Sequence, residues 1–212
     1  MSLEFPGLAP RNKSIASCSC YAIDLEFHVR RMPGDRFAEH VFNGLAPGAA
    51  LTVRGPWGRF TFNEAAPRPV LFLAYETGFP PIKSLIEHSL RIDFPHPRHL
   101  YWAVHELDGH YLDGYCRSLV DTLDHFQYSP LVVPREASRG EWTPAETAML
   151  ESVRRVLADH PDIASYEIYA TGPARNMRAA AALLLARGLP GSQLHIDHLE
   201  RYEAPRLLAS AG

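Results

Sequence analysis

The chain has 212 residues, of which 46% are hydrophobic and 21% are charged, and its formal net charge is −3. This near balance excludes a broad basic surface for nucleic acid and a polybasic membrane anchor. No apolar run reaches the roughly 18 residues that a membrane-spanning helix needs, and no signal peptide is visible at the start. Three cysteines cannot all pair, which favours a reducing compartment. We therefore expect a soluble cytoplasmic protein that binds neither nucleic acid nor membrane.

The first part of the chain, residues 1–66, consists of short alternating stretches separated by glycine and proline turns. Apolar and polar residues alternate at 23–29, which is the period-two pattern of a half-buried strand. The same pattern recurs at 51–53 and at 60–62, whereas residues 35–44 have the spacing of a short helix. These patterns predict a small antiparallel β domain.

The second part, residues 67–212, alternates between strands and helices. Residues 70–74 form a continuous apolar run, as expected of a strand that is buried on both faces of a parallel sheet. Further strands are predicted at 100–104, 166–170 and 194–196, with a third strand that ends at 131–133, and helices are predicted at 82–90, 111–123, 143–156 and 173–187. The predicted fold class is α/β, with a partial antiparallel β-barrel followed by a doubly wound parallel sheet.

Two strand ends in the second part predict a ligand site. Ligands of a doubly wound sheet bind beyond the carboxyl ends of its strands, and two of these ends run through glycine turns into helices, at residues 74–81 and 169–173. Glycine allows close approach of the backbone, and a helix N-terminus favours an anion. A nucleotide site is one interpretation. Tight structural turns are the other, because neither turn is a complete dinucleotide-binding fingerprint.

The histidines of the chain predict no metal site. His105 and His110 are five residues apart, so they would not share one face of a helix, and a solvated loop is the simpler interpretation. His195, Asp197 and His198 lie close together in the sequence, but a site needs further ligands that the pattern does not supply.

Cys18 and Cys20 are separated by one residue, and we expect them on the same face of a strand. A disulfide between cysteines so close together would be strained, and the chain lacks a second cysteine pair for zinc. We therefore expect two packed thiols.

Several segments, in the same order, resemble one known family. Residues 68–88, RPVLFLAYETGFPPIKSLIEH, resemble the strand, turn and helix that open the NAD(P)H domain of the ferredoxin–NADP reductases. The bacterial flavin reductases and the deoxysugar-biosynthesis reductases of that family are the most similar. Other segments that resemble the family's motifs are 11–17, 27–34, 51–60, 99–104, 171–177 and 194–197.

The resemblance implies two cofactors, FAD and NAD(P)H, and hydride transfer from NAD(P)H to the flavin followed by electron delivery to an acceptor. It implies that residues 1–66 are a shortened FAD-binding-like domain and residues 67–212 an NAD(P)-binding-like domain. The acceptor would be a redox partner protein. A shortened barrel exposes sheet edges, which predicts a homodimer.

The resemblance also assigns flavin contacts. Arg11 would contact the FAD pyrophosphate, Ser14 would hydrogen-bond near flavin N5, and Lys13 would lie beside the flavin. The side of the adenine diphosphate would be lined by His28, Val29 and Arg30.

Contacts with NAD(P)H are assigned in the same way. Thr77 and Gly78 would meet its nicotinamide and pyrophosphate, and Thr171, Gly172 and Pro173 would close over the nicotinamide. The predicted catalytic residues are Ser14, Thr77 and Thr171.

The chain departs from the family's pattern at several places. Lys13 stands where the family has an aromatic ring that stacks on the flavin. Asp35 and Ala38 replace small and hydroxyl residues of the pyrophosphate loop, and a carboxylate there would repel a phosphate. Glu76 belongs to a Tyr-Glu pair in place of the usual Gly-Gly. The main prediction is a flavin-dependent NAD(P)H oxidoreductase. The alternative is a catalytically degenerate relative that serves as a binding or interaction module without tight flavin binding.

Overall fold

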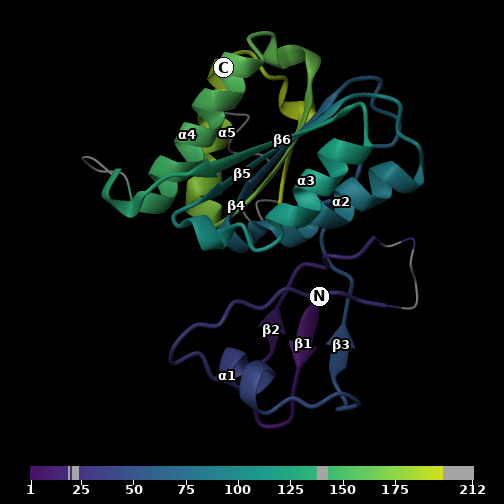
Figure 1. Cartoon of the computed structure of the whole chain (residues 1–212), viewed down its shortest axis with the longest axis vertical. Helices are drawn as coiled ribbons and strands as arrows, with labels where there is room; N and C mark the ends of the chain where they lie inside the picture. The colour runs from purple at the N-terminus through teal and green to yellow at the C-terminus, as the bar shows by residue number, and fades with distance from the viewer. Residues whose placement is uncertain (19, 21–23, 138–142, 198–212) are drawn as a thin grey trace.

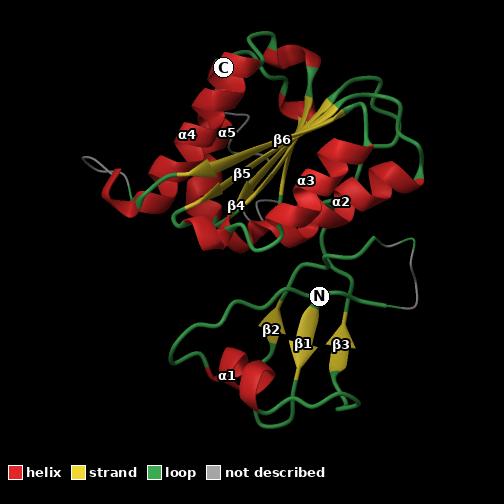
Figure 2. Ribbon diagram, viewed as in Figure 1, coloured by secondary structure: helices red, strands yellow, loops and turns green. Residues whose placement is uncertain are grey.

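The chain folds into two sheets that lie one above the other in Figure 1. The computed structural model describes residues 1–18, 20, 24–137 and 143–197. A three-stranded antiparallel sheet contains the N-terminus, and a five-stranded parallel sheet carries helices on both faces (Figure 2). The predicted α/β fold class, a small antiparallel part before a doubly wound parallel sheet, is confirmed. The boundary at residues 66 and 67 stays a prediction.

The small sheet has the order β2-β1-β3. Its central strand β1 (Ser2–Glu4) pairs antiparallel with β2 (Arg11–Asn12) and with β3 (Thr52–Arg54). Helix α1 (Arg36–Asn43) begins where the sequence predicts a short helix. The fully buried core of this part consists of Leu3, Phe5 and Phe37. Because this core is small, strands of only two or three residues are enough to cover it.

Two predicted strands of the first part are wrong. Residues 24–30 and 60–62 belong to neither sheet, and residues 21–23 lie outside the described chain. Phe62 stacks instead on Tyr169 of the parallel sheet, with ring centroids 5.7 Å apart and an interplanar angle of 12°. Phe60 also meets Tyr169, edge to face at 5.8 Å. At residues 60–62 the alternating phenylalanines therefore pack on Tyr169, which gives the period of a strand without strand pairing.

The large sheet has the order β6-β5-β4-β7-β8, and all its strand pairs are parallel. Its strands are β4 (Val70–Tyr75), β5 (Arg98–Val104), β6 (Phe126–Val132), β7 (Glu167–Thr171) and β8 (Leu194–Ile196). Every residue of β4, β5 and β7 is buried. Burial on both faces accounts for the continuous apolar runs from which these strands are predicted.

Helices cover both faces of the large sheet (Figure 2). Helices α2 (Phe79–Arg91) and α3 (Asp113–Thr122) pack on one face, and α4 (Pro144–Asp159) and α5 (Ala174–Ala186) pack on the other. Helix α4 begins with the capping box that the sequence contains at residues 143–146. Within the described residues, no helix combines the length and apolar character needed to cross a bilayer. The cytoplasmic location stays a prediction.

The strand order creates a topological switch point between β4 and β7. The chain runs from β4 outward to β5 and β6, and then returns to the other side of β4 as β7 and β8. Ligands of such sheets bind in the crevice outside the carboxyl ends at this point. The short helix η1 (Glu76–Gly78) follows β4, and β7 ends at Thr171, so both predicted glycine turns lie at the switch point.

Candidate functional site

Two cavities, of about 280 Å³ and 540 Å³, adjoin this switch point. They share the lining residues Val29, Arg30, Glu76 and Thr77. Both cavities are therefore bounded by the loop around residue 30 and by the turn that follows β4. The larger volume lies within the range of roughly 300–1,000 Å³ that is typical of small-molecule sites.

The smaller cavity is rich in positive charge, and we call it the cationic cavity. Its lining includes four cationic side chains, Arg11, Lys13, Arg30 and Arg135, and two carboxylates, Asp35 and Glu76. The larger one, which we call the wide cavity, has the opposite character. Its carboxylates are Glu26, Glu76, Glu106 and Asp108, and its basic side chains are His28 and Arg30. Coulombic attraction would draw an anionic group into the cationic cavity and away from the wide cavity.

Asp35 places a carboxylate of the chain's own at the N-terminus of α1. Its Oδ1 accepts hydrogen bonds from the backbone N–H of Phe37 at 2.9 Å and of Ala38 at 3.4 Å, and from Arg11 at 3.3 Å. Desolvation opposes the charge, but these hydrogen bonds and the Arg11 charge lower the pKa of Asp35. Asp35 therefore holds, at neutral pH, the donors that would otherwise meet an incoming phosphate.

Lys13 lies beside this cap. Burial lowers its pKa, the charge of Asp35 opposes that effect, and the charge of Arg11 adds to it. The backbone of Lys13 is fixed because its N–H donates to the carbonyl of Met1 at 2.8 Å. Lys13 thus brings a partly desolvated cation to the cationic cavity.

Glu76 joins the two parts of the protein. Its carboxylate accepts hydrogen bonds from Arg30 and, at 3.0 Å, from the backbone N–H of His105. Its carbonyl accepts from the indole of Trp102 at 3.0 Å. The backbone of Glu76 has φ of +49°, a left-handed conformation that favours glycine. This explains the glycine that the resembling family has at this position, and the three contacts hold glutamate there instead.

Tyr75 and His105 form a buried pair next to Glu76. The Nδ1–H of His105 donates to the carbonyl of Val133 at 2.8 Å, so Nε2 accepts the Tyr75 hydroxyl, also at 2.8 Å. Burial, and then the charge of Glu76, raise the pKa of Tyr75 to about 12. Tyr75 is therefore a neutral donor over the physiological range.

The other histidines singled out in the sequence also engage in hydrogen bonds. Nε2 of His110 donates to the carbonyl of Trp102 at 2.8 Å, and Nε2 of His195 donates to Glu167 at 2.6 Å. His198 lies outside the described residues. The imidazoles of His110 and His195 are thus hydrogen-bonded to residues of β5 and β7.

The two glycine turns pack directly on each other. The hydroxyl of Thr171 donates to the carbonyl of Gly78, and Thr171 itself is only 1% exposed. A Cβ atom on Gly78 would lie 2.8 Å from the carbonyl oxygen of Thr171. A Cβ atom on Gly172 would lie 2.8 Å from the Met177 side chain. Gly78 is therefore needed for packing against the backbone of Thr171, whereas a side chain at Gly172 would have to displace only the end of the flexible Met177 side chain.

The structure brings together six of the residues that the resemblance assigns to cofactors. The residues that line one or both cavities are Arg11, Lys13, His28, Val29, Arg30 and Thr77. The predicted residues outside these linings are Ser14, Gly78, Thr171, Gly172 and Pro173. The hydroxyl of Ser14 donates to Asp197 at 3.1 Å, just after β8. The cofactor and catalytic roles of all these residues stay predictions.

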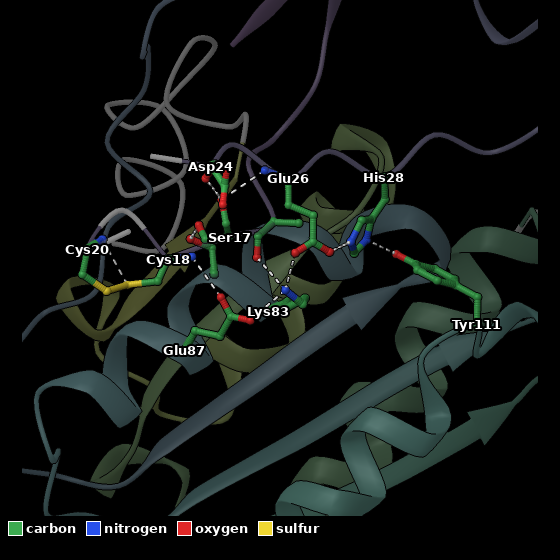
Figure 3. Close-up of polar contacts among 11 residues, drawn as sticks. Ser17, Cys18, Cys20, Asp24, Glu26, His28, Lys83, Glu87 and Tyr111 are labelled. Atoms are coloured by element: carbon green, nitrogen blue, oxygen red, sulfur yellow. Dashed lines mark hydrogen bonds and ion pairs between the residues drawn. A yellow bond between two sulfur atoms is a disulfide. The ribbon is translucent and has the colours of Figure 1, made fainter. Parts of the chain in front are cut away.

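A chain of polar contacts leads away from the wide cavity (Figure 3). His28 accepts the Tyr111 hydroxyl at 2.8 Å and donates to Glu26 at 2.6 Å. Lys83 on α2 donates to Glu26 and to Glu87, both at 2.7 Å. The sequence analysis did not single out Lys83, although a lysine among the apolar positions of a predicted helix indicates a charge held at a buried position. Glu26 and Tyr111 gave no such signal.

We expect Lys83→Met to lower the free energy of unfolding by about 2 kcal/mol at pH 7, because two carboxylates lose a charged partner. Burial opposes the charge, but hydrogen bonds to Glu26 and Glu87 raise the pKa of Lys83. The same contacts lower the pKa of Glu26 against its own desolvation. The difference from wild type should therefore shrink in acid as Glu26 is protonated, and in alkali as Lys83 loses its proton.

Urea unfolding between pH 3 and pH 11 measures this difference. Arg117→Met is the matched control, because Arg117 forms an exposed ion pair with Asp113 within one helix, and losing an exposed pair should cost little stability. Equal losses of unfolding free energy in Lys83→Met and Arg117→Met would contradict a stabilising role for the contacts of Lys83 with Glu26 and Glu87.

Cys18 and Cys20 form a disulfide, so the prediction of two packed thiols is wrong. The prediction assumed a strand, but neither residue belongs to one, and their Cα atoms are 5.2 Å apart. This separation lies within the range of about 4.4–6.8 Å for disulfides. Cys116 is a free and fully buried thiol.

Sequence comparison finds relatives over most of the chain, although no protein-family model matches it. Over 187 residues it is 28% identical to CDP-6-deoxy-L-threo-D-glycero-4-hexulose-3-dehydrase reductase of Yersinia pestis, covering 88% of this chain and 54% of that protein. Over 199 residues it is 28% identical to the reductase component of propane 2-monooxygenase of Mycolicibacterium goodii, covering 92% and 56%. The resemblance to the ferredoxin–NADP reductase family is confirmed.

Solved structures of similar reductases share this fold. A cytochrome P450 reductase of Amycolatopsis superposes with a TM-score of 0.77 and 24% identity, covering 92% of this chain and 58% of that one. A ferredoxin–NADP⁺ reductase of Neisseria gonorrhoeae, solved with bound FAD and NADP, gives a TM-score of 0.72 and 16% identity, covering 92% and 83%. The chain spans about half the length of the curated relatives it matches.

Proposed function

We propose that this chain is a flavin-dependent NAD(P)H oxidoreductase that passes electrons from NAD(P)H through a flavin to a redox partner protein. The cationic cavity carries the proposal, because Arg11, Lys13 and Arg30 line it together at the switch point of the sheet. These are three of the flavin contacts that the family resemblance implies. The relatives support an oxidoreductase, since they are named reductases, and nothing in the comparisons favours a binding module without redox activity.

The charges of the two cavities suggest how the ligand lies. Four cations would hold flavin phosphates in the cationic cavity. The wide cavity, with its carboxylates and the ring of Tyr111, suits an uncharged ring system. When bound, the flavin supplies the hydride-accepting chemistry. The cations of the cationic cavity would neutralise the phosphate charge. The flavin and NAD(P)H would then lie beside Thr77.

The residues of the cationic cavity fit a flavin phosphate only in competition with the protein's own groups. Arg11 is paired with Asp35, and Arg30 is paired with Glu76. A phosphate must displace or share these partners, so part of its Coulombic attraction is offset. We therefore propose that flavin is held loosely and exchanges with solution.

We expect the purified chain to oxidise NADH or NADPH only when FAD or FMN is added, with an artificial electron acceptor present. Stopped-flow absorbance of the nicotinamide and of the flavin measures both half-reactions. Arg11→Ala should weaken flavin binding by about tenfold, because a charge-assisted contact is lost.

Arg154→Ala is the control, since Arg154 pairs with Glu151 on α4 and lines neither cavity. Absence of nicotinamide oxidation with either flavin would contradict the proposed function. The electron acceptor and a homodimer remain proposals, and chemical cross-linking at working concentration tests the dimer.

A further inference from the structure

We propose that Cys18 and Cys20 are a redox-active disulfide that undergoes exchange with external dithiols. The bond joins a buried residue to an exposed one, because Cys18 is 1% exposed and Cys20 lies at the surface. Neither cysteine lines the cationic or the wide cavity. In Figure 3 the disulfide stands at the far end of the contact chain from Tyr111. This proposal does not rest on flavin binding.

His88 connects the buried sulfur to a carboxylate. The Nδ1 atom of His88 lies 3.8 Å from Sγ of Cys18, and its Nε2 lies 2.9 Å from Glu64. A carboxylate only accepts hydrogen bonds, so Nε2 carries a proton and Nδ1 faces the sulfur. A thiol, an imidazole and an orienting carboxylate form the arrangement that activates nucleophiles in enzymes.

Backbone donors complete the environment of Cys18. The N–H of Cys20 donates to the Cys18 sulfur at 3.2 Å. The N–H of Cys18 donates to Glu87 at 2.9 Å, which fixes the backbone against α2. A thiolate formed on Cys18 would therefore meet one N–H donor and, when His88 is protonated, the imidazolium as well. Such contacts make Cys18 the better leaving group of the two cysteines.

The exchange follows from this geometry. A thiolate of the dithiol attacks the exposed Cys20 sulfur, the Cys18–Cys20 bond breaks, and its electron pair leaves on Cys18 beside His88. The second thiol of the reagent then attacks the mixed disulfide and releases Cys20. One dithiol is thereby oxidised to a disulfide, and the protein gains two electrons and two protons. In the reverse direction, Nδ1 of His88 takes the proton of Cys18.

The same three side chains could also suit a soft metal ion, since their ligand atoms lie within 4.8 Å of one another. The sulfurs are bonded to each other, however, and a metal needs two thiolates. The observations therefore favour thiol–disulfide exchange. The titratable groups that face the His88 ring are Cys18, Cys20 and Glu64, and the ring also contacts Phe62.

The test uses the full chain with dithiothreitol as the dithiol, and alkylation with mass spectrometry counts free thiols. Before reduction, only Cys116 should be free, and it should react slowly, because burial raises the pKa of its thiol to about 12. After reduction of the native protein, Cys20 and Cys18 should be labelled. His88→Gln should slow the reduction by about tenfold, which is less than the usual effect of a general acid or base.

A pH profile separates this role from mere packing. After correction for the thiolate fraction of dithiothreitol, the wild-type rate should be higher where the imidazole is protonated, because its Nδ1–H then stabilises the leaving thiolate, and the pH profile of His88→Gln should lack this component. His125→Gln is the control, since His125 is exposed. Glu64→Gln should lower the rate of reduction by less than His88→Gln does. Because the Glu64 side chain is 61% exposed, this variant keeps the test available if His88→Gln does not fold.

Three results would overturn the proposal. The first is two free thiols at Cys18 and Cys20 in protein purified without reductant. The second is an identical rate and pH profile in the wild type and both variants. The third is one bound equivalent of zinc that protects both cysteines from alkylation, which would make the cluster a metal site.

Discussion

Gly78→Ala is expected to lower the free energy of unfolding by about 1–3 kcal/mol, the usual range for overpacking a filled interior. The new Cβ atom would lie 2.8 Å from both the carbonyl oxygen and the hydroxyl oxygen of Thr171. Thr171 ends β7 in the interior of the large sheet, so its backbone cannot yield without moving the strand. Urea unfolding followed by tryptophan fluorescence measures the loss.

Gly114→Ala is a matched control with the opposite expected sign. Gly114 lies in the first turn of α3, and its added Cβ would meet nothing within 4 Å. Alanine is the better helix former, so stability should rise by up to about 1 kcal/mol. If Gly78→Ala lowers the free energy of unfolding no more than Gly114→Ala does, the close contact between Gly78 and Thr171 does not hold the two turns together.

The large sheet could be predicted because its signals are local. Strands buried on both faces consist of continuous apolar residues, as in β4, and α4 begins at a capping box that is legible in the sequence. The small sheet gave weaker signals. Strands β1 and β2 have three and two residues, too few for any period. Residues 60–62 showed a period that came from packing on Tyr169.

The candidate site was predictable to the extent that strand ends and family motifs mark it. Thr77 and Arg30 could be located in this way, and both line the cavities. Contacts between distant segments could not be predicted. Lys83 meets Glu26 across 57 positions, and His28 meets Tyr111 across 83. The Cys18–Cys20 bond depends on a local departure from the strand conformation that the alternating pattern favoured.

Asp35→Ser should tighten FAD binding by about tenfold if flavin phosphates occupy the cationic cavity. A bound phosphate and the Asp35 carboxylate would carry like charges, which repel each other. The substitution removes that repulsion and releases Arg11 from its ion pair. Serine is as good an N-cap as aspartate, so α1 should remain capped. Flavin fluorescence titration gives the affinity, and thermal unfolding confirms that the fold is retained.

Asp124→Ser controls for the change in net charge, because Asp124 is exposed in a turn and lines neither cavity. Equal tightening in both variants would indicate a general charge effect. If a folded Asp35→Ser protein binds FAD no better, the donors held by Asp35 are not the phosphate site. Because hydrogen bonds and Arg11 lower the pKa of Asp35, its carboxylate stays charged at neutral pH. The wild-type affinity should therefore approach that of Asp35→Ser only in acid, where Asp35 is protonated and no longer competes.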